Sequence, residues 1–390
     1  MKLDGVKVLD LSLFLPGPML TLMMADHGAD VIKVEPAGEG EPSRHIGLST
    51  HGQAVWFRNT HRGKRSVQLD LKSAEGQAAF WALAAEADVL VEAFRPGVVD
   101  RLGVGYAAVK AVNPGIVYCS ISAFGQDGPY RDRPAHDLAV EALAGLVALN
   151  EGQDGKPAMP GLMAADALAS LTALSGVLMA LLRREKTGQG DHLDVAMLDS
   201  LMAWTPNATG PVFAEGRANV PKAERSWGGA AMFNLYECAD GRWIVLGGSE
   251  VKFAANLLEA LGRPDLLDPA RLPPGPGQEP LRAFFRETFR TRTQAAWEAW
   301  FAGRDICFAP VRSLKDAFDD PAVAARGMIS RDANGDAVVG TPLLFREEPG
   351  RVNPKAPALD EHRGQGWRPP RPSPGGEREG PAPQAWEGEG

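Results

Sequence analysis

Two residues with chemically useful side chains stand at the starts of apolar helical runs. His136 lies beside Asp137 in PAHDLAVEAL (residues 134–143), and Asp166 lies in GLMAADALAS (161–170). An imidazole, with an ordinary pKa of about 6.5, exchanges a proton near neutral pH, although histidine is also a common loop residue. A carboxylate such as Asp166 can act as a nucleophile, and it is equally favoured at a helix start as a cap. The residues alone leave these alternatives open, and they favour a capping role for Asp137.

Composition narrows the class of protein. The chain has 390 residues, of which 44% are hydrophobic and 23% charged, as in an ordinary globular protein of about two domains. Its net charge of -8 argues against a nucleic-acid surface, so an anionic ligand would have to meet local basic clusters. The N-terminal sequence has no secretory pattern and no run of 18 apolar residues is apparent, so neither secretion nor a membrane span is expected.

The sequence shows no pattern typical of a metal site, a disulfide framework or a common nucleotide-binding loop. Cys119, Cys238 and Cys307 are odd in number and far apart, which indicates a reducing cytoplasm rather than a disulfide framework. The histidines show no ligand spacing, so no metal site is expected. The glycine-rich stretches PGP (16–18) and AGEG (37–40) match neither a dinucleotide fingerprint nor a Walker loop.

The first 150 residues alternate between strand-like and helix-like patterns. Apolar runs predict strands at 6–12, 29–36, 66–72, 88–94 and 115–124. Helices are expected between them, at 15–29, 75–87 and 98–111. This alternation predicts a Rossmann-like parallel sheet, whose ligands bind beyond the carboxyl ends of the strands.

The rest of the chain predicts a second, smaller domain. Two apolar helices at 138–149 and 165–184 complete a large domain over residues 1–205. A linker over 206–230 precedes a small α+β domain over 231–330, with a hairpin around Asp240-Gly241 and helices near 251–262, 280–290 and 293–303. Residues 331–352 return to the large domain, and the Pro/Gly-rich 353–390 reads as a tail without its own core.

Basic residues suggest where an anion could bind. Arg58, Arg62, Lys64 and Arg65 form one cluster, which is either a phosphate site or a solvated turn. Arg95 and Arg101 flank a loop at a predicted strand end, where ligands bind on such sheets.

Five motifs in order resemble the class III coenzyme A transferase family (CaiB/BaiF type), which also contains the α-methylacyl-CoA racemases. They are ADVIKVEP (29–36), FRNTHRGKRSVQLDLK (57–72), DVLVEAFRPGVVDRLG (88–103), SAFGQDGPY (122–130) and TGQGDHLDVAMLDS (187–200). The resemblance covers roughly residues 1–350. It implies an interlocked homodimer, with acyl-CoA bound between subunits and no cofactor beyond the CoA of the substrate.

The resemblance also implies residues that bind CoA. They are Arg44, Leu69, Arg95, Arg101, Gly125 and Asp137. Arg44 is included because Glu35 is followed here by Pro36, where the family often has an arginine. Gly125 and Gln126 are expected to approach the thioester, where a backbone N–H could stabilise an enolate oxygen.

Two chemistries follow from the resemblance. A transferase would use the Asp166 carboxylate to attack the acyl thioester, giving a mixed anhydride. A racemase would place Asp166 and His136 on opposite faces of the α-carbon as two acid/base groups, with Glu250 orienting the imidazole. His136 favours the racemase, because transferases commonly carry an aromatic residue there.

The sequence departs from the racemase pattern at Leu162, and it also leaves a non-enzymatic class of protein open. Leu162 stands where related racemases have an asparagine that supports the aspartate. A non-enzymatic nucleotide-binding protein would keep the basic motifs and need neither His136 nor Asp166. The sequence therefore favours an α-methylacyl-CoA racemase, with a CoA transferase as the alternative.

Overall fold

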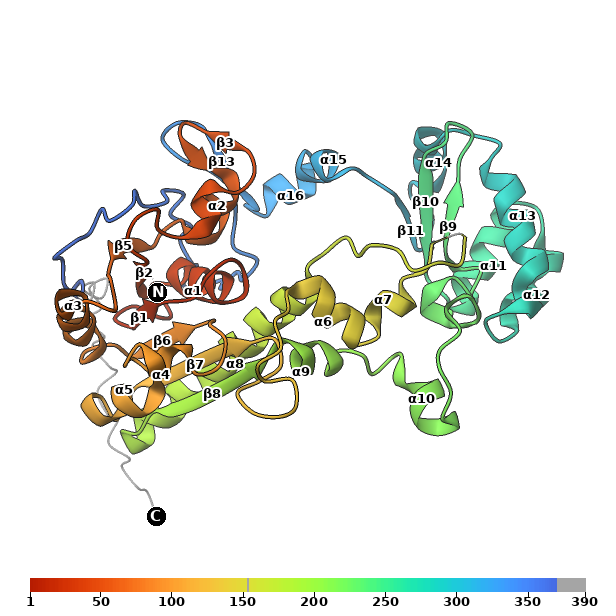
Figure 1. Ribbon diagram of the computed structural model, residues 1–390. Coiled ribbons are helices and arrows are strands. Elements are labelled where there is room, and N and C mark those ends of the chain that lie inside the picture. Colours follow the sequence, from red (N-terminus) through yellow and green to blue (C-terminus); the bar gives the residue numbers. More distant parts are fainter. Residues whose placement is uncertain (153, 370–390) are drawn as a thin grey trace, which may run out of the picture.

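The computed structural model describes residues 1–152 and 154–369. The chain forms two lobes, a large one built on a parallel sheet and a smaller one built on an antiparallel sheet (Figure 1). The predicted α/β class is confirmed at this level.

The large lobe contains a six-stranded parallel sheet in the order β5-β2-β1-β6-β7-β8. Its strands are β1 (Lys7–Asp10), β2 (Asp30–Glu35), β5 (Arg65–Gln68), β6 (Val89–Glu92), β7 (Val117–Ser122) and β8 (Asp191–Ala196). The first five overlap the segments predicted as strands, but each observed strand is shorter than its predicted segment, and β5 ends four residues before its segment does. The sixth was not predicted, because polar residues occupy half of DHLDVA and the strand is only partly buried.

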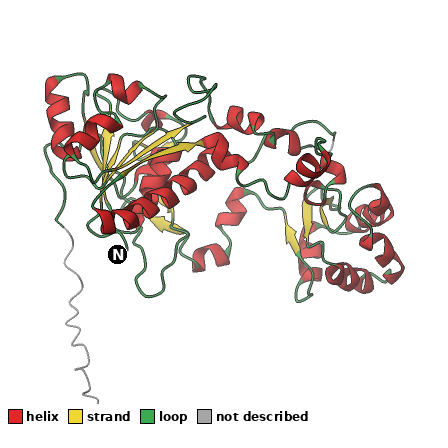
Figure 2. Cartoon of the chain, turned by 90° about the horizontal axis from the view of Figure 1, so that it is seen from below, coloured by secondary structure: helices red, strands yellow, loops and turns green. Residues whose placement is uncertain are grey.

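Alternating side chains of each strand enter two different cores. Val8 and Val89 point to one face, whereas their neighbours Leu9 and Leu90 point to the other. Helices cover both faces, as Figure 2 shows. The first core includes residues of α1 (Pro16–Asp26) and α8 (Ala164–Thr187), and the second includes residues of α3 (Ala74–Ala84) and α5 (Tyr106–Val112). The sheet is therefore doubly wound.

Two segments predicted as single helices are interrupted at glycines with positive φ. The segment 98–111 forms α4 (Val98–Arg101) and α5, with Gly103 at φ 75° between them. The segment 138–149 forms α6 (Asp137–Leu143) and α7 (Leu146–Leu149), separated by Gly145 at φ 83°. Glycine adopts this conformation without strain, which explains both interruptions.

The small lobe packs helices against an antiparallel sheet in the order β11-β10-β9. Strands β9 (Phe233–Glu237) and β10 (Trp243–Gly247) form the expected hairpin, with Gly241 at φ 71° in its turn. The remaining elements of this lobe are α11 (Val251–Ala260), η4 (Pro264–Leu266), α12 (Leu267–Arg271), η5 (Pro276–Gln278), α13 (Glu279–Phe289), α14 (Gln294–Phe301) and β11 (Phe308–Pro310).

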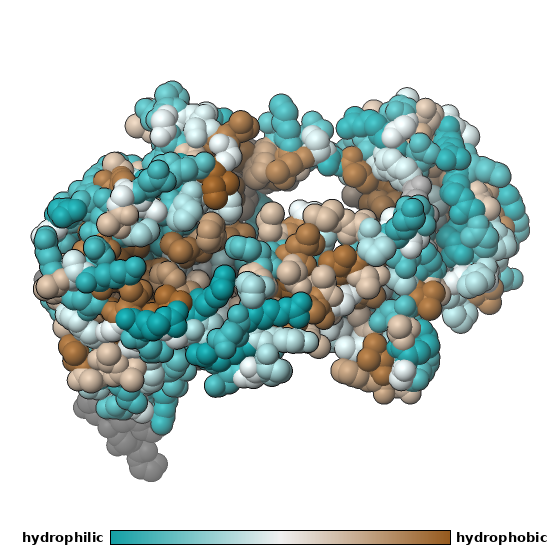
Figure 3. Space-filling model, in the orientation of Figure 1, coloured by the Kyte–Doolittle hydropathy of each residue, from teal (hydrophilic) through white to brown (hydrophobic). Residues whose placement is uncertain are grey.

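Two stretches of chain connect the lobes, and an open gap remains between them in the space-filling view (Figure 3). The first follows α9 (Met197–Met202) and includes α10 (Thr209–Glu215), η2 (Pro221–Ala223) and η3 (Arg225–Trp227), so the predicted linker contains short helices. The return stretch carries α15 (Leu314–Phe318) and α16 (Pro321–Ala325). The other short elements, all in the large lobe, are η1 (Pro42–His45), β3 (Ser49–Thr50), β4 (Gln53–Ala54), α2 (Val55–His61), β12 (Ile329–Arg331) and β13 (Ala337–Val339).

The segment expected to be a tail begins as a packed part of the large lobe. His362 N–H donates to the carbonyl oxygen of Ser66 at 2.9 Å, and Gln68 N–H donates to the Asp360 carboxylate at 2.8 Å. Trp367 packs in the second core and donates to the carbonyl of Leu83 at 3.1 Å. Residues 360–365 therefore lie along β5, Trp367 reaches α3, and 370–390 fall outside the described residues.

Helix α8 is long and apolar enough to cross a membrane by length and composition alone, with a mean hydropathy of 1.8 over its most apolar 18 residues. It packs against β7, β8, α1 and α9, so its inner face belongs to the core. About a third of that window is buried, and the rest leaves apolar side chains exposed.

Candidate active site

A cavity of about 450 Å³ lies at the carboxyl ends of four strands of the parallel sheet. This is where the topology of a doubly wound sheet places ligands. Its walls come from the loops after β1, β6, β7 and β8, from the segment before α6, and from the first turn of α8. The lining residues are Leu13, Phe14, Pro16, Ala93, Phe94, Arg95, Pro96, Ile121, Ser122, Ala123, Phe124, Arg131, Arg133, Pro134, Ala135, His136, Asp166 and Met197.

His136 and Asp166 line this one cavity. His136 is the N-cap residue of α6, and its imidazole is exposed and makes an edge-to-face contact with the Phe14 ring, with centroids 6.0 Å apart. Asp166 lies in the first turn of α8 and is half-buried. Residues 30 positions apart in sequence are thus brought together by α6 and α8, which pack against each other.

The carboxyl group of Asp166 has an unusual acidity. Burial raises its pKa to about 7, and the negative charges of Asp137 and Glu141 contribute to the rise. A carboxyl group with this pKa exists in both protonation states near neutral pH. It therefore suits either attack on a carbonyl or proton transfer.

Two carboxylates of α6 cap the first turn of α8. Asp137 accepts the N–H of Asp166 at 3.0 Å, and Glu141 accepts the N–H of Ala164 at 2.9 Å. Met163, the N-cap residue of α8 itself, contributes no side-chain hydrogen bond to this turn. Asp137 is therefore a cap, as the sequence favoured, but it caps α8 rather than its own helix, and it does not line the cavity.

Arginines surround one side of the cavity. Arg95, Arg131 and Arg133 line it. Gly97 has φ 78°, and a Cβ added at this position would lie 3.3 Å from an Arg131 Nη and 3.4 Å from an Arg101 Nη, so the predicted Arg101 belongs to the same group. Several guanidinium groups here can bind phosphate or carboxylate.

Sequence reasoning missed Arg131 and Arg133. The signal was the RDRP stretch immediately before Ala135-His136, in the loop that carries the histidine to the cavity. Arg131 is held there by its Nε, which donates to the carbonyl of Gln126 at 2.9 Å.

The loop after β7 was expected to bring the backbone amides of Gly125 and Gln126 to the thioester, but both amides are bonded within the chain. Gly125 N–H donates to Ser122 Oγ at 2.9 Å, and Gln126 N–H donates to Asp194 Oδ2 at 2.9 Å. Neither amide is free for an oxyanion, because both close the loop that follows β7. Gly125 has φ 86° and does not line the cavity.

The basic cluster of residues 58–65 is neither a phosphate site nor a solvated turn. All four side chains are buried, and each pairs with an acid. A buried charge needs such a partner, which explains the arrangement. The pairs are Arg58–Asp336, Arg62–Asp26, Lys64–Asp10 and Arg65–Asp30.

Arg44 likewise forms an ion pair with an acid of the same chain, Glu35. Its Nε and Nη2 each donate to the Glu35 carboxylate at 2.7 Å, and its guanidinium stacks on Phe57 at 3.8 Å. Burial alone would raise the pKa of Glu35, but Arg44 and Ser66 lower it below its ordinary value. Arg44 thus serves as the counterion of a buried acid.

The other predicted residues lie apart from this cavity. Leu69 lines a second cavity of about 500 Å³ between β5, α3 and residues 363–366. Leu162 lines a third, beside Glu141, Trp204 and Trp227. Glu250 is the exposed N-cap residue of α11 in the small lobe. Within the chain, the structure therefore does not bring Glu250 to His136. Among the described residues, no group of three or more His, Cys, Asp or Glu is arranged to hold a metal ion.

Comparison with known proteins identifies the family. Residues 3–363 match the model of CoA-transferase family III. The chain is 32% identical over 365 residues to acetyl-CoA:oxalate CoA-transferase of Acetobacter aceti, covering 92% of this chain and 93% of that protein. It is 31% identical to succinyl-CoA--D-citramalate CoA-transferase of Chloroflexus aurantiacus, covering 92% of each.

Solved structures agree. A CaiB/BaiF family protein from Brucella suis superposes with a TM-score of 0.81 at 30% identity, covering 92% of this chain and 97% of that one. A hypothetical protein from Mycobacterium tuberculosis superposes with a TM-score of 0.78 at 29% identity, with the same coverage of both chains. The chain belongs to CoA-transferase family III and is an enzyme of acyl-CoA substrates.

Proposed function

We propose that this enzyme is a CoA transferase that moves CoA between carboxylic acids through the carboxylate of Asp166. The observation that carries the proposal is the position of Asp166 in a cavity lined by arginines at the carboxyl ends of the sheet. The named relatives, which are CoA transferases, support it. They favour this function over the racemase that the sequence favoured.

The proposed chemistry needs no further cofactor. The Asp166 carboxylate attacks the acyl-CoA carbonyl and displaces the CoA thiolate, which leaves a mixed anhydride. The thiolate then attacks the aspartyl carbonyl, which releases the first acid and leaves an aspartyl thioester. The second acid's carboxylate attacks this thioester, and the thiolate returns to the new acyl group. Each step breaks one acyl bond and forms another, and Asp166 is regenerated.

The trapping experiment uses hydroxylamine with an acyl-CoA and no acceptor acid. We expect wild-type protein to be converted at Asp166 to the hydroxamate and to lose activity, as detected by peptide mass spectrometry. Asp166→Asn should show neither labelling nor transfer, whereas Asp137→Asn should still be labelled at Asp166. Absence of any Asp166 adduct during measurable transfer would rule out the covalent route.

A racemase is retained as a second candidate because His136 lines the same cavity as Asp166. Two acid/base groups at one α-carbon would allow a 1,1-proton transfer. Incubation of a 2-methylacyl-CoA in deuterated water decides between the two. Exchange and inversion at the α-carbon, lost by about 10² to 10⁴-fold in His136→Ala, would favour the racemase. Acyl transfer without exchange would leave the transferase.

We also propose a homodimer in which acyl-CoA binds between subunits. Helix α8 exposes an apolar stripe, Leu171, Leu178, Met179 and Leu182, of which Met179 and Leu182 are 69% and 68% exposed. A continuous apolar stripe of this kind is expected to be covered in solution. A second copy of the chain is the proposed cover, and such a copy could also bring its Glu250 toward the cavity.

A further inference from the structure

Phe14 holds an unfavourable backbone conformation at the wall of the cavity. Its φ is +63°, and it is one of three non-glycine residues with positive φ in the described chain. An aromatic residue there costs on the order of 1 kcal/mol or more, so its surroundings must impose the conformation. The ring that results from this conformation lines the cavity and meets the imidazole of His136 edge to face.

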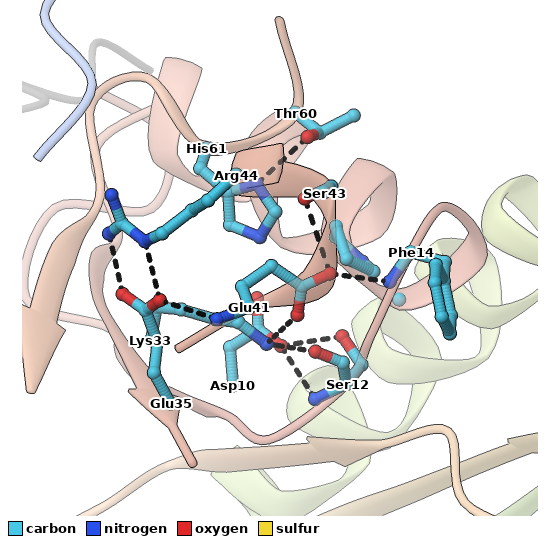
Figure 4. A network of polar contacts seen from close by, with 12 residues as sticks. Asp10, Ser12, Phe14, Lys33, Glu35, Glu41, Ser43, Arg44, Thr60 and His61 are labelled. Carbon is cyan, nitrogen blue, oxygen red and sulfur yellow. Dashed lines mark hydrogen bonds and ion pairs between the residues drawn. The ribbon is translucent and has the colours of Figure 1, made fainter. Parts of the chain in front are cut away.

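The Glu41 carboxylate holds this conformation. Its Oε1 accepts the N–H of Phe14 at 2.9 Å, from 27 residues away in sequence (Figure 4). Glu41 is fully buried, and its other oxygen, Oε2, lies 3.5 Å from Nζ of Lys33. A buried carboxylate forms a strong hydrogen bond to a backbone amide.

The carboxylate is itself fixed by a buried set of charges. Lys33 Nζ lies 3.7 Å from Asp10 and donates to the carbonyl of Ser12, two residues before Phe14. Lys64 lies 3.0 Å from Asp10 on its other side. Burial alone would raise the pKa of Asp10, but Lys33 and Lys64 lower it well below its ordinary value. Two cations and two anions thus balance beneath the loop that follows β1.

We infer that Glu41 is a positioning residue for His136, acting through the backbone of Phe14. Glu41 does not line the cavity, so it touches no substrate. It fixes the Phe14 ring, and the ring limits where the exposed imidazole can lie. The catalytic relevance of this arrangement rests on the proposed function, because it matters for turnover only if the cavity is the active site.

The decisive experiment follows the His136 imidazole by NMR in protein labelled at histidine Cε1, with the signal assigned by its loss in His136→Gln. In Phe14→Leu the signal should shift, because the ring current is removed. Glu41→Leu should move it to nearly the same position, since the released backbone carries the ring away. Glu41→Gln keeps an amide oxygen for the Phe14 N–H and should restore most of the wild-type position.

Ser43→Ala is the matched control. Ser43 Oγ donates to the same Glu41 oxygen at 3.2 Å but has no bond to Phe14. The control should leave the His136 signal in place. If Glu41→Leu fails to fold because Lys33 loses a partner, Lys33→Met/Glu41→Leu removes both buried charges together and should show the same displaced signal.

Turnover supplies a second readout. Glu41→Leu should lower kcat by about tenfold with a nearly unchanged KM for acyl-CoA, since the displaced Phe14 ring lines the cavity in which the Asp166 carboxylate reacts, and misplacement there affects the chemical step more than binding. In a Phe14→Gly background, where positive φ is unstrained, Glu41→Leu should have almost no further effect.

A wild-type His136 signal in folded Glu41→Leu, or additive effects in the double-mutant cycle, would overturn the inference. A wild-type protein without acyl transfer would refute the proposed function alone. The NMR comparison would still test the positioning role of Glu41, so the two failures are distinguishable.

Discussion

The carboxylate of Asp137 accepts the backbone N–H of Asp166 at 3.0 Å, which joins the start of α6 to the first turn of α8. One side chain therefore fixes the backbone beneath the proposed nucleophile and places a negative charge beside it. These two effects are separable, because asparagine keeps the acceptor oxygen and removes the charge.

We expect kcat/KM for acyl transfer to rise with pH through about 7 and then level off, as Asp166 ionises. Asp137→Asn should move this apparent pKa down by on the order of one unit, because a like charge is removed. The measurement is a pH-rate profile between pH 5 and 9 in both proteins. An identical profile in the variant would mean that Asp137 does not act on Asp166 electrostatically.

Asp166 should also make stability depend on pH. Its pKa is raised from 3.8 to about 7, so between these values the unfolded chain releases a proton that the folded chain holds. The free energy of unfolding contributed by this group is therefore highest below pH 4 and falls as pH rises to about 7. Asp166→Asn cannot ionise, so its stability relative to wild type should increase by on the order of 2 kcal/mol between pH 4.5 and pH 8. Urea unfolding at the two pH values measures this difference, and a constant difference would contradict it.

The arginines at the cavity should act on binding. Arg95→Ala and Arg131→Gln should each raise the KM for acyl-CoA by about tenfold with a smaller loss in kcat, since a guanidinium pairs with the anionic groups of CoA in ground and transition states alike. Arg217→Gln, which removes an exposed arginine paired with Glu215 outside the cavity, is the control. An unchanged KM in Arg131→Gln would mean that CoA approaches from another side.

The apolar stripe of α8 should be needed for assembly. Leu182→Glu places a charge in the proposed contact and should shift sedimentation from dimer to monomer at micromolar concentration. Leu314→Glu, at a leucine that is 75% exposed on α15, should leave the assembly unchanged. A wild-type protein that sediments as a stable folded monomer would remove the basis for a site between subunits.

Much of the fold was predictable because it follows from local patterns. The apolar runs gave five strands of the sheet, and the rule for carboxyl ends places the loops after them around one cavity. That rule also explains why His136 and Arg95, separated by 41 positions, line the same space. Strand β8 was not predicted, because it is an edge strand and edge strands need not be uniformly apolar.

Long-range charge pairing was beyond reach of the sequence. Arg62 and Arg58 look like an exposed basic cluster until Asp26, 36 residues earlier, and Asp336, far later, are placed beside them. Local composition does not reveal whether a charge is buried, because the counterion comes from tertiary structure. For the same reason, the ion pair between Arg44 and Glu35 could not be predicted from the sequence.

The segment 360–365 lies along β5, the edge strand of the large sheet, and its Asp360 and His362 bond to residues nearly 300 positions earlier. An uncovered edge is a template for pairing with other chains. During synthesis, residues 65–68 emerge long before the segment that covers them, and the whole small lobe is made in between. The nascent chain therefore carries an unprotected edge for most of its elongation, which makes this strand the place where premature association between chains would begin.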